Sequence, residues 1–409
     1  MTVLTGIAGV LAMLGIGYLL STERGRINWR TIGIALSLQA FIAALILYVP
    51  QGGQVFDAVV NGVRHVLGFA IEGVQFVFGA DFEQNLGFTI ALNVLPVIVF
   101  VGALMSVLYY LGVMQRVVGT FGGWLHKLLG TSHPESISAV SNIFVAHTDA
   151  PLVIRPYLKE MTESELFAVM VGGCATIASA VMMGFAQLGV ELKYLITASF
   201  MAAPGGLLMA KLMIPETTER TRKFDPTDMG DVEKPVNIFE AIANGATTGM
   251  QVALSVGALL IAFVAFVALI NGALSGIGHW FGIEGLTLQW LLGKLFMPIA
   301  LVIGVPWAEA AAAGSLIGQK LVINEFYAYL SFIEIKDTLS AQTQLIVTFA
   351  LCGFANLSSI AILMGGLGAI VPARRHDIAR LGLKAVIGGT LVNLMNASLA
   401  GLIFSLQAA

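Results

Sequence analysis

Charged residues are scarce in this chain. Only 11% of its 409 residues are Asp, Glu, Lys or Arg, and 57% are hydrophobic, whereas a soluble globular protein carries about 25% charged residues. This composition is typical of a polytopic membrane protein. The near balance of 21 basic and 24 acidic residues also lacks the positive excess of a nucleic-acid-binding protein, so no nucleic-acid partner is expected.

Cysteine is scarce too, and familiar catalytic motifs are absent. The two cysteines, Cys174 and Cys352, lie inside apolar runs, so neither a disulfide framework nor a thiolate metal site is expected. The sequence has no H-E-x-x-H pair and no G-x-x-x-x-G-K-[ST] loop, which are typical of zinc hydrolases and of nucleotide-binding proteins. We therefore predict no catalytic residues, no cofactor and no ATP-driven activity.

The apolar residues gather in about eight long runs. A helix that crosses a bilayer needs about 20 consecutive apolar residues, and each run comes near to that length. The first run has neither the basic region nor the cleavage site of a signal peptide, so we interpret it as a retained helix. The runs cover residues 3–20, 31–50, 86–114, 166–190, 195–210, 241–277, 345–372 and 385–409.

The basic residues predict the orientation of these spans. Cytoplasmic segments of membrane proteins carry an excess of Lys and Arg. The segments after the first, third, fifth and seventh spans hold most of the 21 basic residues. We therefore expect these segments in the cytoplasm and both termini on the outer side. Residues 54–80 are amphipathic, and we expect them to lie on the outer surface of the membrane instead of spanning it.

Two further stretches are apolar enough to enter the membrane but too interrupted to cross it. Each contains charged residues, and each is followed by an uncharged span with a polar, glycine-flanked patch. Irregular backbone at membrane depth survives only where protein or a wet cavity surrounds it. We therefore predict two re-entrant hairpins, at residues 137–158 and 310–332.

The two hairpin regions repeat each other. The motif N-x-F-x-A occurs at residues 142–146 and 324–328, and the motif G-x-A-[TN]-x-x-S occurs at residues 173–179 and 353–359. The distance between the two copies is nearly the same for both motifs. Because the first hairpin would enter from the cytoplasm and the second from outside, the repeat is inverted. Inverted repeats with broken helices are typical of secondary transporters.

Acidic residues at the predicted hairpin tips are candidates for ligand binding. Asp149 and Glu325 occupy these tips, and an acidic residue at membrane depth is costly enough to indicate function. A carboxylate accepts two hydrogen bonds side by side, which suits vicinal hydroxyls or an amino-bearing ring. The alternative is a carboxylate that is satisfied by backbone amides at the start of a helix.

Neutral polar residues lie at the predicted helix breaks. Asn142, Thr176, Asn356 and Ser359, together with the exposed carbonyls of broken helices, suit a small hard cation such as Na⁺. The alternative is that these side chains hydrogen-bond neighbouring helices to one another. His147 is compatible with substrate binding, with proton relay or with a structural cap.

Four stretches resemble the concentrative nucleoside transporter family. They are SNIFVAHTDAPLVIRPYL (141–158), GGCATIAS (172–179), GQKLVINEFYAYLSF (318–332) and CGFANLSS (352–359). Their order and spacing match as well, so the resemblance extends from about residue 86 to the end of the chain. It implies a homotrimer of eight-span protomers, in which a scaffold holds a mobile transport domain that moves substrate together with Na⁺ or H⁺.

The resemblance also implies a division of the chain into five parts. The two hairpins, each with two spans, would form the mobile repeats. The parts are an N-terminal scaffold with the outer amphipathic helix at 1–114, a first repeat at 115–213, a cytoplasmic linker at 214–238, a long scaffold helix at 239–284 and a second repeat at 285–409.

Individual residues acquire roles from the same resemblance. The substrate-binding residues would be Glu325, Asn356 and Ser359 around the ribose, Phe354 in the pocket wall, and His147, Thr148 and Asp149 facing the base. The Na⁺ ligands would be the side chains of Asn142 and Thr176 and the backbone carbonyls of Val145 and Ile177.

The first hairpin tip departs from the family pattern. The usual sequence is G-Q-T-E, and this chain has Ala146-His147-Thr148-Asp149. The carboxylate is one methylene shorter and an imidazole replaces a carboxamide, so the groups offered to a base differ. The base preference of the family is therefore not transferred to this chain, whereas the Na⁺ positions match.

Together these patterns predict Na⁺-coupled symport of nucleosides into the cell by alternating access, in the inner (plasma) membrane of a bacterium. The alternatives are H⁺-coupled symport through His147 or Asp149, and transport of a related polar solute by the same fold. A membrane-embedded enzyme would need a nucleophile or a metal set beside these two residues, and the sequence supplies neither. A channel would not need two hairpins that close on one site.

Overall fold

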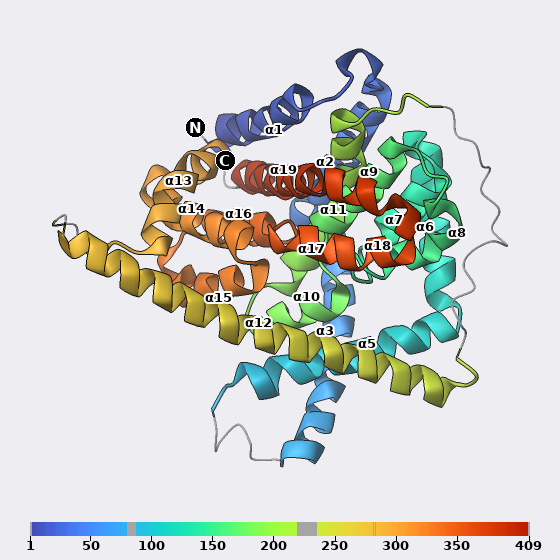
Figure 1. The fold of residues 1–409 in the computed structure, drawn as a ribbon, viewed down its shortest axis with the longest axis horizontal. Coiled ribbons are helices and arrows are strands. Elements are labelled where there is room, and N and C mark those ends of the chain that lie inside the picture. The colour runs from blue at the N-terminus through green and yellow to red at the C-terminus, as the bar shows by residue number, and fades with distance from the viewer. Residues whose placement is uncertain (1, 80–86, 219–234, 281, 283, 408–409) are drawn as a thin grey trace.

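The computed structural model describes residues 2–79, 87–218, 235–280, 282 and 284–407, and this part of the chain consists of helices and loops without a β-strand. The helices pack together in one bundle (Figure 1). The predicted all-α fold is confirmed. Most of the predicted linker, residues 219–234, lies outside the described residues, as do the first residue of the third predicted span and the last two residues of the eighth.

The longer elements follow one another along the whole chain. They are α1 (Thr2–Leu19), α2 (Trp29–Leu47), α3 (Pro50–Phe78), α5 (Leu95–Tyr110), α6 (Val113–Leu129), α7 (His133–Ser141), α8 (Arg155–Leu158), α9 (Glu163–Ala175), α10 (Ser179–Gln187), α11 (Leu192–Met213), α12 (Ile238–Trp280), α13 (Leu288–Val302), α14 (Trp307–Val322), α15 (Glu325–Ile335), α16 (Ala341–Leu351), α17 (Ser358–Gly365), α18 (Leu367–Ile370) and α19 (Arg375–Gln407).

Six of the eight predicted spans correspond to helices that are long and apolar enough to cross a membrane. These segments are Trp29–Leu47, Ile90–Tyr110, Glu163–Gln187, Leu192–Met213, Ile238–Trp280 and Pro372–Gln407. The other two predicted spans consist of shorter apolar helices, which are Val3–Leu19 for the first and Ala341–Leu351 with Ser358–Ile370 for the seventh.

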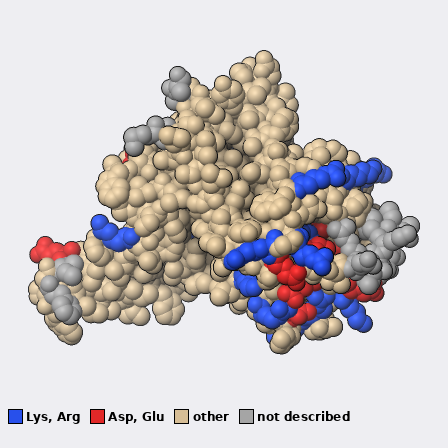
Figure 2. Space-filling model, turned by 90° about the horizontal axis from the view of Figure 1, so that it is seen from above, with Lys and Arg blue, Asp and Glu red and all other residues tan. Residues whose placement is uncertain are grey.

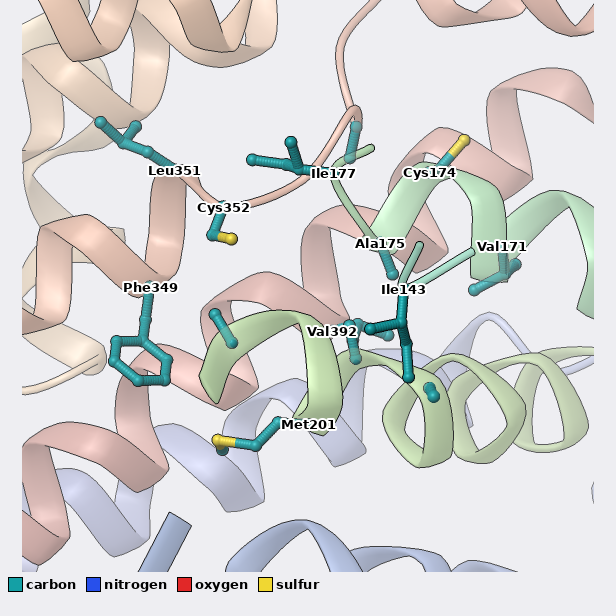
Figure 3. Close-up of a cluster of buried hydrophobic side chains, with 14 of the residues drawn as sticks. Ile143, Val171, Cys174, Ala175, Ile177, Met201, Phe349, Leu351, Cys352 and Val392 are labelled. Atoms are coloured by element: carbon teal, nitrogen blue, oxygen red, sulfur yellow. The ribbon is translucent and has the colours of Figure 1, made fainter. Parts of the chain in front are cut away.

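Two helices are interrupted where the repeated G-x-A-[TN]-x-x-S motif lies. The backbone is unwound between α9 and α10 at residues 176–178, and between α16 and α17 at residues 352–357. The two unwound segments meet, because Phe354 N donates a hydrogen bond to the Thr176 carbonyl oxygen at 3.1 Å. Figure 3 shows the buried side chains of Ile177 and Cys352, one from each unwound segment.

Hairpin 2, defined here as residues 307–335, consists of α14 and α15. The two helices meet at Ile323 and Asn324, and the Asn324 side chain caps α15 by accepting a hydrogen bond from Tyr327 N at 2.8 Å. Helix α13 precedes this hairpin and forms an angle of 115° with α14. Neither α13 nor its counterpart α6 was predicted from the sequence as a separate element.

Hairpin 1, defined here as residues 133–158, is less regular. Its first arm is α7, its tip at residues 142–149 has no helix, and its second arm is a 3-10 turn at Ala150–Ile154 followed by the single turn of α8. Pro151 and Pro156 lie in this second arm, and each removes a backbone donor, which explains the absence of a continuous helix. In Figure 1, α6 to α8 and α13 to α14 lie toward opposite ends of the molecule, as an inverted repeat requires.

Helix α3 contains the stretch that was predicted to lie on a membrane surface. One stripe of the helix is buried, with Val60, Leu67 and Val74 at seven-residue spacing, whereas Val55 and Phe76 are exposed. The helix is not among the segments that could cross a membrane. It also runs across the direction of α19 in Figure 1. These features agree with a helix that does not span, and its position at the outer surface stays a prediction.

Charged side chains gather at one end of the molecule. On the face seen in Figure 2, most Lys, Arg, Asp and Glu side chains lie at one end. A smaller charged group lies at the other end, and the broad middle carries almost none. Because the two figures share a horizontal axis, the end with most of the charges is the one at which Figure 1 places α6, α8 and α18. Both termini lie close together toward the opposite end. The sides of the membrane on which the basic segments and the termini lie stay a prediction.

Candidate functional site

The acidic residue of hairpin 2 is buried and hydrogen-bonded. Glu325 is the first residue of α15, directly after the cap Asn324, and only 6% of its surface is exposed. Its carboxylate oxygen Oε2 accepts a hydrogen bond from Asn356 Nδ2 at 2.8 Å. The start of a helix carries a partial positive charge, which together with this hydrogen bond offsets part of the cost of burying the Glu325 carboxylate.

The Asn356 amide is held in a fixed orientation by the segment that follows it. Its oxygen Oδ1 accepts hydrogen bonds from Ser358 Oγ at 2.6 Å, from Ser359 N at 3.0 Å and from Ser359 Oγ at 3.1 Å. With the oxygen engaged in this way, the amide nitrogen faces Glu325. The single Ser359 hydroxyl proton is shared between Asn356 Oδ1 and the Phe354 carbonyl oxygen. Hairpin 2 and the unwound part of the α16–α17 pair therefore bring Glu325, Asn356 and Ser359 together in one polar cluster, and ribose binding by these residues stays a prediction.

His147 and Phe354 bring the two hairpin regions together. Their ring centroids lie 5.0 Å apart at an interplanar angle of 58°. His147 is 6% exposed, and neither ring nitrogen has a hydrogen-bond partner within the described part of the chain. A side chain at position 173 would lie 2.6 Å from the Cβ of His147, so Gly173 is needed for this packing. Because buried polar atoms without partners are costly, the imidazole is suited to meet a ligand.

The other two residues of the predicted base-facing set lie nearer the surface. Thr148 Oγ1 donates a hydrogen bond to Asp149 Oδ1 at 3.2 Å, and the Asp149 side chain is exposed. Thr148 packs against the α17–α18 junction, where a side chain at Gly366 would come within 2.7 Å of its Cγ2. The two predicted hairpin acids therefore differ in burial, since Glu325 is buried and Asp149 is exposed.

Asn142 and Thr176, two of the predicted cation ligands, both lie beside Gly172. The Asn142 amide nitrogen is 3.4 Å from the position that a Cβ would take at Gly172, and Thr176 Oγ1 donates to the Gly172 carbonyl oxygen at 2.9 Å. Asn142 is 1% exposed, and neither of its amide atoms has a partner among the described residues. A hydroxyl that donates its proton keeps its lone pairs, so Thr176 can still offer oxygen to a cation.

The carbonyls that complete the predicted cation set come from irregular backbone. Val145 belongs to the hairpin 1 tip and Ile177 to the unwound segment after α9. Ser179 Oγ donates to the Phe144 carbonyl oxygen at 2.5 Å, which ties that tip to the start of α10. Neutral oxygen ligands of this kind fit a small hard cation. Binding by Val145 and Ile177 stays a prediction.

Asn393 and Lys320 are buried beside the two unwound segments, and neither was predicted from the sequence as a site residue. Asn393 Nδ2 donates to the Ala175 carbonyl oxygen at 2.7 Å and to the Cys352 carbonyl oxygen at 2.8 Å. Its oxygen Oδ1 accepts from Lys320 Nζ at 2.6 Å. The available signal was an amide inside the apolar run 385–409, since polar residues within membrane spans are often functional.

Comparison with protein-family models covers nearly all of this fold. Residues 8–81 match the model for the N-terminus of Na⁺ dependent nucleoside transporters, and residues 194–401 match the model for their C-terminus. This chain belongs to the concentrative nucleoside transporter family. Residues 91–191, which include hairpin 1 and the α9–α10 break, match a third model, described as nucleoside recognition.

Known proteins resemble this concentrative nucleoside transporter over its full length. It is 56% identical to an uncharacterized transporter of Haemophilus influenzae, with 100% of both chains covered. It is 47% identical to the nucleoside permease NupC of Helicobacter pylori, with 99% of each covered. The structure of CNTnw in an inward-facing substrate-bound state superposes with a TM-score of 0.95 at 52% identity, covering 100% of this chain and 99% of that chain.

The family membership decides two of the questions that the sequence raised. The chain is an integral membrane transporter and not an enzyme, which agrees with the expectation that it has no catalytic residues. The polar cluster around Glu325 and Asn356, together with the unpaired atoms of Asn142 and His147, is therefore a candidate ligand site and not a reaction centre.

Proposed function

We propose that this transporter is a symporter that takes nucleosides into the cell together with Na⁺. The observation that supports it most is the proximity of two kinds of buried group. The unpaired amide of Asn142 and the hydroxyl of Thr176 lie beside Gly172, and the Thr176 carbonyl is bonded to Phe354. Phe354 in turn contacts His147. A cation and an organic solute bound to these groups would share neighbouring segments of backbone.

The proposed nucleoside contacts divide between the two hairpins. On the hairpin 2 side, Glu325, Asn356 and Ser359 form the fixed polar cluster, and a carboxylate beside an amide and a hydroxyl suits the vicinal hydroxyls of ribose. On the hairpin 1 side, His147 offers a ring face and two nitrogens, which suits a base. Thr148 and Asp149 complete this side.

The proposed Na⁺ contacts use neutral oxygens. Asn142 and Thr176 supply side-chain oxygens, and Val145 and Ile177 supply carbonyls. A small hard cation prefers oxygen ligands, and unwound backbone in transporters commonly coordinates Na⁺. The name of the family model, which includes Na⁺ dependence, supports the same choice.

Alternating access would follow from the inverted repeat. Hairpins 1 and 2 and the two broken helices meet at one region, and rocking of this group against the remaining helices would expose the region to one side at a time. We further propose that the protein lies in a bacterial inner membrane with both termini on the outer side.

We also propose a homotrimer. The long helix α12 exposes large apolar side chains along its length, including Leu254, Ile261, Phe266 and Leu269, and such a surface meets lipid or another subunit. Native mass spectrometry of the detergent-purified protein should give three times the mass of the chain. A monomer under conditions that preserve binding would contradict the proposal.

The decisive experiment is uptake into proteoliposomes. Labelled uridine and adenosine are offered with an inward Na⁺ gradient, with choline in place of Na⁺, and with an inward H⁺ gradient without Na⁺. We expect accumulation above the external concentration only with the Na⁺ gradient. Accumulation driven by H⁺ alone would instead favour the H⁺-coupled alternative.

Two controls define the solute. Protein-free liposomes report leakage, and unlabelled nucleosides and related polar solutes compete with the label. We expect nucleosides to compete best. If another class of solute competes better than every nucleoside, the proposed substrate is wrong, even if Na⁺ drives the uptake.

A further inference from the structure

Lys320 is a buried cation outside the proposed ligand contacts. It lies on α14, and only 2% of its surface is exposed. Among the described residues no carboxylate lies within ion-pair distance of its ammonium group. Instead, Nζ donates to the Ala350 carbonyl oxygen at 2.9 Å and to Asn393 Oδ1 at 2.6 Å. A buried ammonium is costly, so its placement requires an electrostatic reason.

The charge of Glu325 supplies part of that reason, and the ends of two interrupted helices supply the rest. Helix α9 ends at Ala175 and α16 ends at Leu351. The last carbonyls of a helix have no partner within it and carry a partial negative charge. Lys320 donates a hydrogen bond directly to one of these carbonyls, that of Ala350. It is connected to the end of α9 through Asn393, which donates to the Ala175 carbonyl. The ammonium thus compensates two helix ends at once.

The Asn393 side chain connects the two unwound segments. Its two amide hydrogens are shared between the Ala175 carbonyl, one residue before Thr176, and the Cys352 carbonyl, two residues before Phe354. The contact is close, since a side chain at Gly353 would lie 2.3 Å from Asn393 Oδ1. In Figure 3, Ala175 and Cys352 lie in one buried region with Val392, the neighbour of Asn393 on α19.

Lys320 determines which way this amide faces. Because its ammonium group can only donate, the group beside it must be Oδ1, and Nδ2 is then directed at the two carbonyls. With a neutral residue at position 320, the Asn393 amide could rotate. In the rotated form its Oδ1 would face the Ala175 and Cys352 carbonyl oxygens, and two acceptors would repel each other. The pair therefore acts as one unit.

We propose that Lys320 and Asn393 are positioning residues that couple the cation site to the nucleoside site. This inference rests on the proposed function. When a cation draws in the groups around Thr176, the shared amide moves the segment that carries Phe354 and Asn356. Without that amide, the hydrogen bond from Phe354 N to the Thr176 carbonyl is the one remaining connection that the described residues show between the two unwound segments.

The test measures the coupling itself. Uridine binding to the purified full chain is titrated with saturating NaCl and with choline chloride, and the ratio of the two dissociation constants is the coupling factor. Asn393→Asp keeps an acceptor for Lys320 but removes both amide hydrogens. Lys320→Met removes the ammonium and leaves Asn393 in place. Each variant is also checked for cooperative thermal unfolding.

Asn396→Asp is the matched control. Asn396 lies one helical turn from Asn393 on α19, is equally buried, and bonds to Gln39 and to the Ala198 carbonyl instead of to the unwound segments. It therefore undergoes the same chemical change without touching the proposed connection.

We expect the coupling factor of Asn393→Asp and of Lys320→Met to fall at least fivefold toward one. Uridine affinity in choline should change by less than about threefold in Asn393→Asp. Lys320→Met also removes the charge that interacts with Glu325, so for this variant only the ratio of the two dissociation constants is compared. Coupling between linked sites is typically 5–150-fold, so the fall is measurable. Asn396→Asp should keep the wild-type factor. If Asn393→Asp does not fold, Lys320→Met decides.

Three results would overturn the inference in different ways. Folded variants that keep the wild-type coupling factor would show that the pair does not connect the sites. An equal loss in Asn396→Asp would show a general effect of burying a charge in α19. A wild-type factor of one would refute Na⁺ coupling itself, and therefore the proposed function on which the inference depends.

Discussion

The two hairpins start their tips with the same motif, N-x-F-x-A, yet the two asparagines have different surroundings. In hairpin 2, Asn324 caps α15 by accepting the Tyr327 amide hydrogen. In hairpin 1, no helix begins directly after Asn142, and neither of its buried amide atoms has a partner within the described residues. The same residue type is therefore a structural cap in one repeat and is available for a ligand in the other.

The acidic residues differ in a similar way. Glu325 is buried and bonded to Asn356, whereas Asp149 is exposed and bonded to its neighbour Thr148. The buried place in hairpin 1 belongs to His147. An inverted repeat can thus keep its architecture while its two copies take separate tasks. We infer that hairpin 2 binds the ribose, which all nucleosides share. We further infer that hairpin 1 contacts the base and the ion.

The largest effect is expected at the buried acid of hairpin 2. Glu325→Gln should weaken uptake of every nucleoside by a similar factor, because the ribose is common to all. Loss of a charged hydrogen bond costs about 1.5–3 kcal/mol, or roughly 10- to 150-fold. Uptake rates for purine and pyrimidine nucleosides measure it. A loss confined to some bases would exclude Glu325 as the ribose ligand.

The next effect concerns the unusual tip of hairpin 1. The double change His147→Gln with Asp149→Glu restores the usual family tip, and it should alter the ranking of nucleosides by about 1–3 kcal/mol, since unpaired buried polar groups cost that much. Coupled uptake should persist. Competition profiles of wild type and double variant are compared. An unchanged ranking with loss of ion-driven accumulation would mean that this tip serves coupling and not base selection.

A third prediction separates the two asparagines. Asn142→Ala should raise the Na⁺ concentration for half-maximal uptake roughly tenfold, and should weaken nucleoside binding at fixed Na⁺, because linkage is reciprocal. Thr176→Ala should act in the same direction.

The matched control for Asn142→Ala is Asn324→Ala, the same change at the corresponding position of hairpin 2. Loss of a cap costs about 0.5–2 kcal/mol of stability, so the variant should unfold at lower temperature while its Na⁺ dependence stays unchanged. Equal shifts in Na⁺ dependence for Asn142→Ala and Asn324→Ala would remove the distinction between the two hairpins.

The smallest effect is expected at Ser358, which the sequence analysis did not single out. Its hydroxyl donates to Asn356 Oδ1 at 2.6 Å, and Ser359 supports the same oxygen. Ser358→Ala should weaken nucleoside affinity by about 0.5–1.5 kcal/mol, the worth of a neutral hydrogen bond. Equilibrium binding of uridine and adenosine measures it. A larger loss than that of Glu325→Gln would show that the orientation of Asn356 matters more than the carboxylate.

The sequence predicted the segments better than their internal structure. Apolar runs and motif repeats are local properties, so six spans and both hairpin regions could be located from residue type and spacing. The irregular second arm of hairpin 1 was not anticipated, although Pro151 and Pro156 lie within it. The unwinding at residues 352–357 was anticipated as a helix break, but its extent depends on contacts such as that between Asn356 and Glu325.

The sequence by itself determined that this protein is helical, membrane-embedded and built from two related halves, because hydrophobicity, charge bias and repetition act along the chain. Only the tertiary structure decided which polar atoms are satisfied. Asn142 and Asn324 stand in the same motif, and Asn393 bonds to a carbonyl 218 residues away. A buried hydrogen bond depends on what the fold brings within about 3 Å, and no local pattern encodes that distance.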